Sequence, residues 1–379
     1  MRVLLVTDWY PAGPDDLAGV FVREHALALG DAGHEVTVLH LTAPVRGSGP
    51  PRLREVAGAH PPLTRFTHGR ARGLGMALHL AAGRLGLARL LRRGFRPELV
   101  HAHEFGAGLV GVSLAHRLRV PAVISEHLSL FALGGVGGAA RLIARRGFAA
   151  ADVVCPASAS LRDALIAGGY RARFEVVPNP VDTDLFRPAA PRAPRPPGEP
   201  ARIVVVAALK PVKGVDLLVE AVALLGRERR DFTVEVIGDG PDREALTALI
   251  RRRGVEDRLR LLGAAARESV ARRLQAADFA VVPSRFETFS VAAAEAQACG
   301  LPIVAGAAGA LTERVGEHGL LCRPEDPADL AATLGAMLDS HRDYDRELIA
   351  ADARARYGRA AVGARWTALY ADLHASRGR

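Results

Sequence analysis

The sequence predicts an α/β fold with two doubly wound domains, and three observations support this prediction. The chain has 379 residues, which is long for one hydrophobic core and sufficient for two domains. Runs rich in Ala, Val and Leu alternate with stretches of helical spacing, which favours parallel sheets covered by helices. A proline-rich segment near the middle separates two series of such units, as an interdomain linker would.

The first half is predicted to alternate strands with helices. A helix is expected at residues 19–29, and strands at residues 3–6, 35–39, 99–103, 122–125 and 149–156. Open parallel sheets bind ligands at the carboxyl ends of their strands. The loops 11–19, 101–104 and 126–138 are therefore expected to lie at one edge of the first sheet.

The second half repeats this organisation after a linker. Residues 188–200 contain six prolines, which cannot pair as a sheet. The expected parts are a first domain at residues 1–183, a linker at 184–200 and a second domain at 201–358. Strands of the second domain are expected at residues 202–207, 233–238, 259–263, 279–283 and 302–305. A final helix from residue 359 has one apolar stripe formed by Trp366, Leu369, Tyr370 and Leu373.

Composition limits the possible partners and locations. The net charge of +9 would suit nucleic acid, but only 5% of residues are aromatic and no stacking platform is visible, so no nucleic-acid partner is expected. The chain contains no apolar run long enough to cross a membrane. Its first residues have no signal-peptide pattern. The three cysteines lack metal spacing, so a reduced, cytoplasmic setting is expected.

A basic helical segment leaves a second location open. Arg84, Arg89, Arg92 and Arg93 alternate with leucines at roughly helical spacing. These arginines could bring the chain to an anionic membrane surface as a weak peripheral contact. They could equally cover the solvent face of a helix whose leucines pack inward.

A carboxylate pair in the second half is a candidate ligand site. Glu287 and Glu295 lie eight positions apart, where a loop is expected to enter an alanine-rich helix. The amides of Phe289, Ser290 and Val291 would then be the free N–H groups of a helix start, which bind anions. The arrangement suits a nucleotide diphosphate, with the deeper carboxylate on its ribose. An ordinary amphipathic helix with solvent-facing glutamates would show the same spacing.

Further segments give the chain a family resemblance. Glu287-x7-Glu295 followed by Cys-Gly-Leu-Pro-Ile-Val closely resembles the nucleotide-sugar signature of retaining glycosyltransferases of family four, which have the GT-B fold. Segments 176–186, 209–218, 236–241 and 261–263 resemble other parts of that family in the family's order. The resemblance implies two Rossmann-like domains that face a central crevice. It also implies that the first domain binds the acceptor, that the second binds the nucleotide sugar, and that helix 359–379 packs back on the first.

The resemblance also assigns roles to individual residues. The donor would be bound by Gly19, Lys213, Glu287, Thr288, Phe289, Ser290, Val291 and Glu295. Lys213 would neutralise the leaving diphosphate, Glu287 would position the sugar, and His127 would act from the first domain. A Glu287 nucleophile in a double displacement is the mechanistic alternative.

Two positions depart from the family pattern. Ala208 stands where many members have arginine, so a two-cation clamp depends on Lys210. One glycine of a family pair is replaced in Gly309-Ala310, ahead of Glu313, so a close backbone approach there is less certain.

The resemblance predicts neither a metal nor a cofactor other than the sugar nucleotide. His101 and His103 would share one strand face, but no third ligand is recognisable near them in the sequence. The predicted function is transfer of a sugar from a UDP- or GDP-sugar to an acceptor hydroxyl, with retention. The alternatives are a nucleotide-sugar 2-epimerase of the same fold and a non-catalytic sugar-nucleotide-binding protein. The acceptor could be a sugar, a lipid-linked sugar or a small molecule.

Overall fold

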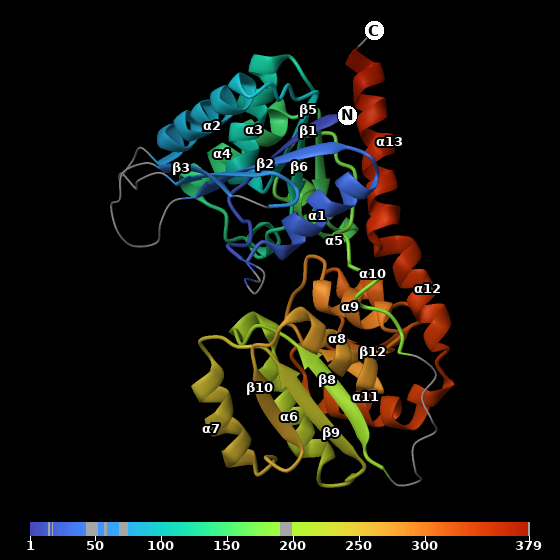
Figure 1. Cartoon of the computed structure of the whole chain (residues 1–379). Helices are drawn as coiled ribbons and strands as arrows, with labels where there is room; N and C mark the ends of the chain where they lie inside the picture. The colour runs from blue at the N-terminus through green and yellow to red at the C-terminus, as the bar shows by residue number, and fades with distance from the viewer. Residues whose placement is uncertain are drawn as a thin grey trace. The chain divides into compact units, whose positions relative to one another are not determined.

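The computed structural model describes residues 1–13, 16, 18–42, 52–56, 59–67, 75–189 and 199–377. They form two compact units (Figure 1). Unit 1 contains Met1–Pro180 and the C-terminal segment from Arg359, and unit 2 contains Val181–Gly358.

The unit boundary lies three residues before the position expected from the sequence, 183. The backbone N–H of Val181 donates a hydrogen bond to Tyr357 O, within unit 2. Phe186, expected in the linker, is 1% exposed and lies under the guanidinium of Arg267. The apolar ring therefore packs into unit 2 instead of serving as a spacer. The linker residues 190–198 lie outside the described residues.

Unit 1 contains a seven-stranded sheet with the strand order β3-β4-β2-β1-β5-β6-β7. All neighbouring strands pair in parallel except β3, which is antiparallel to β4. The strands are β1 (Arg2–Thr7), β2 (Glu35–Thr42), β3 (Arg52–Val56), β4 (Leu63–Thr67), β5 (Leu99–His103), β6 (Ala122–Glu126) and β7 (Val153–Pro156). The strand expected from residue 149 begins later, because Ala149 and Ala150 continue the preceding helix. Alanine favours that conformation.

Helices cover both faces of this sheet. They are α1 (Val20–Asp31), α2 (Gly75–Arg92), α3 (Phe105–Leu118), α4 (Gly138–Ala150), α5 (Ala159–Ala167) and α13 (Arg359–Arg377), with a short 3-10 turn η1 (Ser129–Phe131). Successive residues of β1 point to opposite faces. Leu4 accordingly joins a core cluster with α2 and α3, and Leu5 joins another with α1 and α13.

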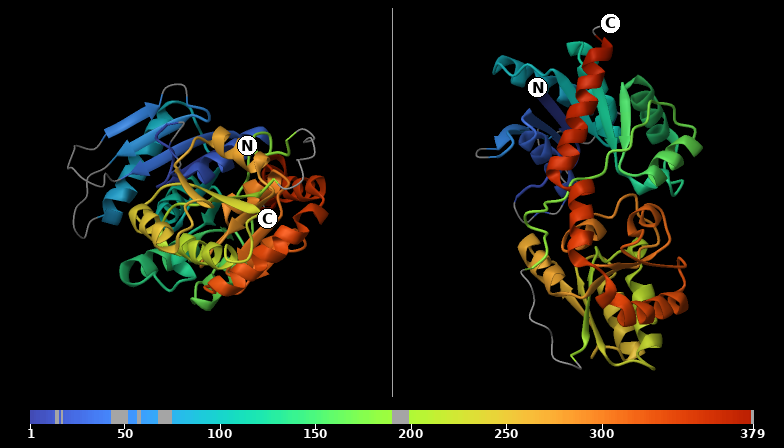
Figure 2. Two further views of the ribbon diagram at one scale, coloured as in Figure 1. Left: turned by 90° about the horizontal axis from the view of Figure 1, so that it is seen from below. Right: turned by 90° about the vertical axis from the view of Figure 1, so that its right-hand side faces the viewer.

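The C-terminal helix α13 is part of the core of unit 1. Its predicted apolar stripe is buried, with Trp366 and Tyr370 fully inaccessible. Gly363 allows close packing, because a Cβ there would lie 2.5 Å from Ala28 O in α1. Figure 1 and the right-hand view of Figure 2 show α13 lying along unit 1, where it contacts α1.

Unit 2 contains a six-stranded parallel sheet with the strand order β10-β9-β8-β11-β12-β13. The strands are β8 (Ala201–Val206), β9 (Phe232–Ile237), β10 (Leu259–Gly263), β11 (Phe279–Val282), β12 (Ile303–Gly306) and β13 (Gly319–Cys322). The helices and 3-10 turns are η2 (Pro211–Lys213), α6 (Val215–Leu225), α7 (Arg243–Arg253), α8 (Arg267–Ala276), α9 (Val291–Ala298), α10 (Leu311–Val315), α11 (Pro327–Ser340), η3 (His341–Asp343) and α12 (Arg346–Tyr357).

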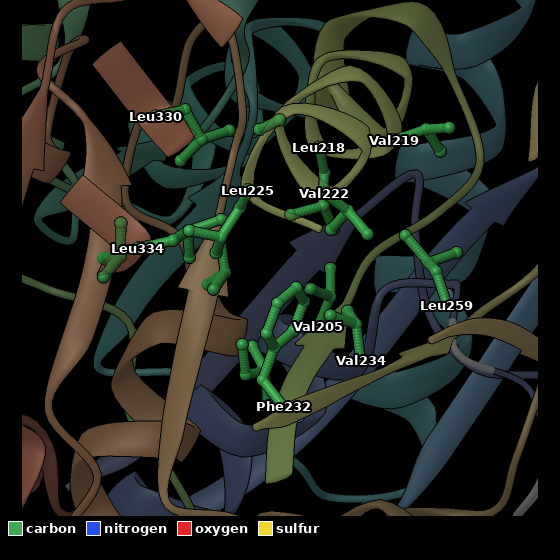
Figure 3. Close-up of a cluster of buried hydrophobic side chains, with 14 of the residues drawn as sticks. Val205, Leu218, Val219, Val222, Leu225, Phe232, Val234, Leu259, Leu330 and Leu334 are labelled. Carbon is green, nitrogen blue, oxygen red and sulfur yellow. The ribbon is translucent and has the colours of Figure 1, made fainter. Parts of the chain in front are cut away.

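The core of unit 2 lies between the sheet and helices α6 and α11. Val205 and Phe232 of the strands meet Val222 of α6 and Leu334 of α11 (Figure 3). The two sheets with helices on both faces make each unit Rossmann-like, as predicted. Among the described residues, no helix has the length and apolar character needed to cross a membrane.

Candidate active site

The loop after β8 presents Lys213 at the carboxyl edge of the sheet of unit 2. Lys213 ends the short turn η2, and Gly214 immediately precedes α6 with φ of 64°. A Cβ on Gly214 would lie 2.0 Å from the carbonyl oxygen of Pro283. Only glycine allows both this left-handed conformation and this close approach. The glycine therefore determines where the preceding lysine lies.

Lys213 meets one of the predicted carboxylates. Its Nζ donates to Glu287 Oε1 at 2.7 Å, and Ser284 Oγ donates to the same oxygen at 2.7 Å. Glu287 is 8% exposed, whereas 28% of the lysine side chain is accessible. The carboxylate is thus fixed, and the ammonium group keeps access to solvent or ligand.

The segment between the two carboxylates starts helix α9 in a strained conformation. Ser290 has φ of 62°, which is uncommon for a residue other than glycine and often marks functional sites. Its hydroxyl accepts a hydrogen bond from Ala293 N at 3.4 Å and so caps the helix. Among the hydrogen bonds found for the described residues, none is donated by the backbone amides of Phe289, Ser290 or Val291. These N–H groups are therefore available to a ligand at the start of α9, beside Glu287. Thr288, also predicted to bind the donor, lies half-buried in the same segment.

The second carboxylate, Glu295, lies on the second turn of α9 and is mostly buried. Its Oε1 is 3.9 Å from Arg267 Nη2 on α8, and both side chains are 12% exposed. Arg267 also lies over the ring of Phe186, 5.5 Å from its centroid. The structure therefore places Glu295 beside a cation that sequence spacing did not identify.

Arg314 of α10 is a second residue that the sequence reasoning missed. It is 4% exposed, its Nε donates to Phe289 O at 2.9 Å, and its guanidinium lies 4.1 Å from the Phe289 ring and 4.2 Å from the Tyr357 ring. It fixes the backbone at the start of α9. No sequence pattern predicts this role, because arginines are usually exposed and a buried one cannot be told from the others by sequence.

Arg285 holds the lysine loop from the other side. It forms two hydrogen bonds to the carboxylate of Asp216, at 2.9 and 2.7 Å, and another to Pro211 O. Its backbone N–H donates to Val212 O at 2.9 Å. The hydrogen bonds from Arg285 lower the pKa of Asp216. Arg285 thus ties the loop after β11 both to α6 and to η2, a link that was also missed.

The two departures from the family pattern have different structural outcomes. Gly309 has φ of 59°, and a Cβ there would lie 2.3 Å from Glu287 O, while Ala310 N donates to the same oxygen at 2.9 Å. The close approach therefore needs only the glycine that remains. Lys210 is exposed, and its ammonium forms no ion pair with the described residues. Lys210 and Lys213 therefore form no fixed two-cation clamp in this structure.

In unit 1, Gly19 occupies a position that excludes other residues. It precedes α1 with φ of 73°, and a Cβ there would lie 2.5 Å from the backbone carbon of Trp9. The chain just before it is described only in part. The close approach to the backbone of Trp9 is sufficient to require glycine at this position, without any contact to a ligand.

His127, predicted to be catalytic, belongs to a group of stacked histidines in unit 1. Its Nε2 lies 3.1 Å from His103 Nδ1, and the two rings are parallel to within 6°. His25 of α1 lies 5.0 Å from the His103 ring, between ring centroids. Trp366 Nε1 of α13 donates to His25 Nδ1 at 3.1 Å, and Asn179 Oδ1 lies 3.1 Å from His25 Nε2.

The next histidine along β5 is held in the same way. His101 Nδ1 lies 2.7 Å from Tyr370 Oη of α13, and its Nε2 lies 2.8 Å from Ser125 Oγ. Its ring stacks on His103, as expected for alternate residues of one strand. Two aromatic residues of α13 thus hold histidines of α1 and β5.

The fold places two further histidines near His103 that the sequence did not show as candidate ligands. The fold brings ring nitrogens of His25, His103 and His127 within 4.8 Å of one another. These ligands come from separate segments, which sequence spacing could not reveal. Because His25 Nδ1 accepts from Trp366, its Nε2 carries the proton and donates to Asn179. Neutral His25 then has no lone pair free, so this arrangement favours a hydrogen-bonded network over a metal site.

Burial keeps these histidines neutral, which predicts acid sensitivity. Burial lowers the pKa of His25 to about 4, and it holds the pKa values of His101, His103 and His127 well below the ordinary value. Below pH 6.5 the unfolded chain binds protons that the folded unit does not, so stability falls as the pH decreases from 6.5 towards 4. From a folded pKa of about 4, we expect His25 alone to contribute a loss of about 2 kcal/mol between pH 7 and 5.

Denaturant unfolding of the wild type and of His25→Gln at both pH values measures this contribution. Glu126, whose pKa burial raises to about 7, has the opposite pH dependence but is present in both proteins. Equal pH dependence in the two proteins would show that His25 is not held neutral.

Comparisons with known proteins provide independent information on the chain. The family model for Glycosyltransferase Family 4 matches residues 18–185, and the model for Glycosyl transferases group 1 matches residues 200–340. A glycogen synthase of Mycobacterium tuberculosis is 31% identical, over 93% of this chain and 90% of that protein. D-inositol 3-phosphate glycosyltransferase 2 of Catenulispora acidiphila is also 31% identical, over 96% of this chain and 93% of that protein.

Solved structures share the fold at lower sequence identity. Sucrose-phosphate synthase from Thermosynechococcus elongatus superposes with a TM-score of 0.79 at 21% identity, covering 99% of this chain and 100% of that one. The Anabaena protein HepE in complex with UDP superposes with a TM-score of 0.76 at 20% identity, covering 98% of this chain and 100% of that one.

Proposed function

Because the chain belongs to glycosyltransferase family 4, and is therefore a GT-B glycosyltransferase that takes its sugar from a nucleotide-sugar donor, we propose that it uses a UDP- or GDP-sugar and retains the anomeric configuration. The observation that carries this proposal is the contact between Lys213 and Glu287 beside the free amides that start α9. The group puts a cation, helix N–H donors and a fixed carboxylate at one edge of unit 2. A sugar diphosphate requires these three elements.

In the proposed donor complex, unit 2 binds the nucleotide. The amides of Phe289, Ser290 and Val291 would bind diphosphate oxygens, and Lys213 would neutralise the charge that grows as the glycosidic bond breaks. Glu295, deeper along α9, would accept hydrogen bonds from the ribose hydroxyls. The half-buried Thr288 would contact the diphosphate beside them.

The contacts of Glu287 support a positioning role. Its Oε1 accepts hydrogen bonds from both Lys213 and Ser284, and burial restricts its motion. These two hydrogen bonds withdraw charge from the carboxylate and make it a weaker nucleophile towards the anomeric carbon. We therefore propose substitution on one face of the sugar with the leaving phosphate as base, and no covalent intermediate on Glu287.

Unit 1 would bind the acceptor. His127 follows β6 at the carboxyl edge of that sheet, where ligands of such sheets bind. The contacts of His103 and His25 around it would keep its ring neutral and oriented for a substrate hydroxyl. Gly19 would contribute a backbone position to the donor diphosphate. The proposal needs neither a metal nor a nucleic-acid partner.

The stereochemical outcome tests the proposed reaction. Thermal-shift measurements with UDP-, GDP- and ADP-sugars would first identify the donor, because a ligand that binds the native state raises its stability. Proton NMR of the first product from an α-linked donor should then show an α-linkage. A β-linked product would exclude the retaining mechanism. Hydrolysis or epimerisation of the donor without transfer would instead favour another activity.

Replacing Glu295 by alanine tests the ribose contact. We expect the Michaelis constant for the donor to rise about 10-fold or more, because a charge-assisted hydrogen bond contributes in the ground and transition states alike. The donor affinity of Glu295→Ala can be compared with that of Glu313→Ala by calorimetry. Like Glu295, Glu313 is a glutamate on a helix of unit 2. It lies on α10 and has no assigned ribose contact. Unchanged affinity in Glu295→Ala would remove the ribose assignment.

We also propose that the protein is cytoplasmic. Unit 1 would make a weak peripheral contact with an anionic membrane. Arg84 and Arg92 of α2 are exposed, whereas Arg89 and Arg93 form ion pairs with Glu55 of β3. Only the first two therefore support contact with lipid. Of the leucines expected to pack inward, Leu87 and Leu90 are buried, but Leu85 is 55% exposed.

A further inference from the structure

A basic hollow lies at the amino edge of the sheet in unit 2. It has a volume of about 520 Å³ and is formed by the segments that follow α6 and α7 and lead into β9 and β10. The Lys213 loop follows β8, so it lies at the opposite, carboxyl edge of the same sheet. The hollow is therefore separate from the proposed donor site. Its charged lining residues are Arg227, Arg230, Arg252, Arg253, Arg258 and Asp257.

Two of the five arginines have partners that hold them in place. Arg258 is 8% exposed, its Nη1 donates to Arg229 O at 2.9 Å, and its guanidinium lies 5.9 Å from the Phe232 ring centroid. Arg253 forms an ion pair with Glu220 of α6 at 2.7 Å. These contacts orient two guanidinium groups of the lining, and Glu220 offsets the charge of Arg253.

The other three arginines leave a surplus of positive charge. Arg227, Arg230 and Arg252 are exposed, and none of them forms an ion pair with the residues that the structure describes. Asp257 is the one acid in the lining and lies 3.5 Å from Arg258. Cations near the C-terminal ends of α6 and α7 favourably oppose the helix dipoles, which accounts for about half a charge per helix. Glu220 and Asp257 each offset one of the five arginine charges and the helix ends about one more, so about two positive charges remain uncompensated.

From this lining we propose that the hollow binds an anion carrying two or more phosphate groups. Guanidinium groups bind phosphate oxygens in pairs, and their planar donors are less strongly hydrated than an ammonium group. A concave wall with several such groups binds a compact polyanion better than a single phosphate does. The anion could be a free phosphorylated compound or the phosphorylated headgroups of an anionic lipid surface. The proposal does not depend on the proposed transfer reaction, because the site is at the other edge of the sheet.

Calorimetry of the full chain with inorganic pyrophosphate tests the hollow directly. We expect binding that weakens as the salt concentration rises, because exposed charges are screened. In Arg227→Glu/Arg252→Glu the affinity should fall at least about 10-fold, as the loss of charge-assisted hydrogen bonds implies. The control is Arg251→Glu, which makes the charge change of one of these two substitutions at an exposed position of α7 outside the lining and should bind as the wild type does.

Pyrophosphate could also occupy the donor site, so its binding is also measured in a variant of the donor site, Lys213→Ala. Lys213→Ala should keep the binding that depends on Arg227 and Arg252. Thermal melting checks that the glutamate variants fold, and the single variants Arg227→Gln and Arg252→Gln repeat the test with a smaller change. No pyrophosphate binding by the wild type, or equal binding by all arginine variants, would overturn the proposal.

Vesicle flotation distinguishes the two sources of phosphate. Phosphatidylcholine vesicles with and without phosphatidylglycerol are compared for the wild type, Arg227→Glu/Arg252→Glu and Arg84→Glu/Arg92→Glu. Flotation that requires Arg227 and Arg252 assigns the hollow to lipid headgroups. Pyrophosphate binding without such flotation assigns it to a free ligand. Flotation lost only in Arg84→Glu/Arg92→Glu places membrane contact on α2 and leaves the hollow to free ligands.

Discussion

Replacing Lys213 by alanine is expected to lower turnover by about 100-fold, the loss typical of one preorganised electrostatic contact. Charge on the departing phosphate increases as the glycosidic bond breaks, so the lysine stabilises the transition state more than the bound donor. The Michaelis constant should change less than the turnover number. Single-turnover rates at saturating donor would measure this difference.

Lys210→Ala is the matched control for this prediction. Lys210 lies three residues earlier in the same loop but is exposed and has no fixed partner among the described residues. Lys213→Ala also leaves Glu287 buried without its cation, so Lys213→Ala/Glu287→Gln should be measured for stability. Near-native turnover in Lys213→Ala together with a loss in Lys210→Ala would show that the wrong lysine had been assigned.

Replacing Gly214 by alanine is expected to destabilise unit 2 by about 3 kcal/mol or more. The left-handed conformation costs a Cβ-bearing residue about 1 kcal/mol. A Cβ that lies 2.0 Å from Pro283 O requires a further movement of the backbone. Because Lys213 is the preceding residue, this movement would also impair donor binding. Denaturant unfolding, followed by a probe in unit 2, measures the loss.

Gly254→Ala provides a control with the same backbone conformation. Gly254 also has φ of 64°, but no atom lies within 4 Å of the position that its Cβ would occupy. It should show the conformational cost alone, about 1 kcal/mol. Equal destabilisation by the two substitutions would mean that contact with Pro283 contributes nothing.

The sequence predicted the central parallel strands because these are buried on both faces and form continuous apolar runs. Strands β3, β4 and β13 were not predicted. Arg52–Val56 and Leu63–Thr67 interrupt their apolar residues with arginine and threonine, and Gly319–Cys322 is only four residues long and starts with glycine. The apolar stripe of α13 was recognised because Trp366 and Tyr370 are large and have helical spacing.

The candidate site was predictable where its chemistry follows chain order. Lys213 next to Gly214, and Glu287 before the start of α9, follow from a motif. Contacts between distant segments were not predictable in this way. Arg314 reaches Phe289, and Trp366 reaches His25 across 341 positions of sequence. Such contacts depend on the three-dimensional fold and have no local pattern.

The path of the chain has a consequence for biosynthesis. Unit 1 is assembled from two segments separated by the whole of unit 2, and its helix α13 leaves the ribosome only after all of unit 2. Until then the face of its sheet that includes Leu5 lacks Trp366 and Tyr370, and His25 and His101 lack their α13 partners. Unit 2 is continuous and complete earlier, so it can fold during translation while unit 1 must wait. A ribosome that stops before α13 therefore releases a chain with a finished second unit and an exposed apolar surface on the first, which is a target for chaperones and proteases.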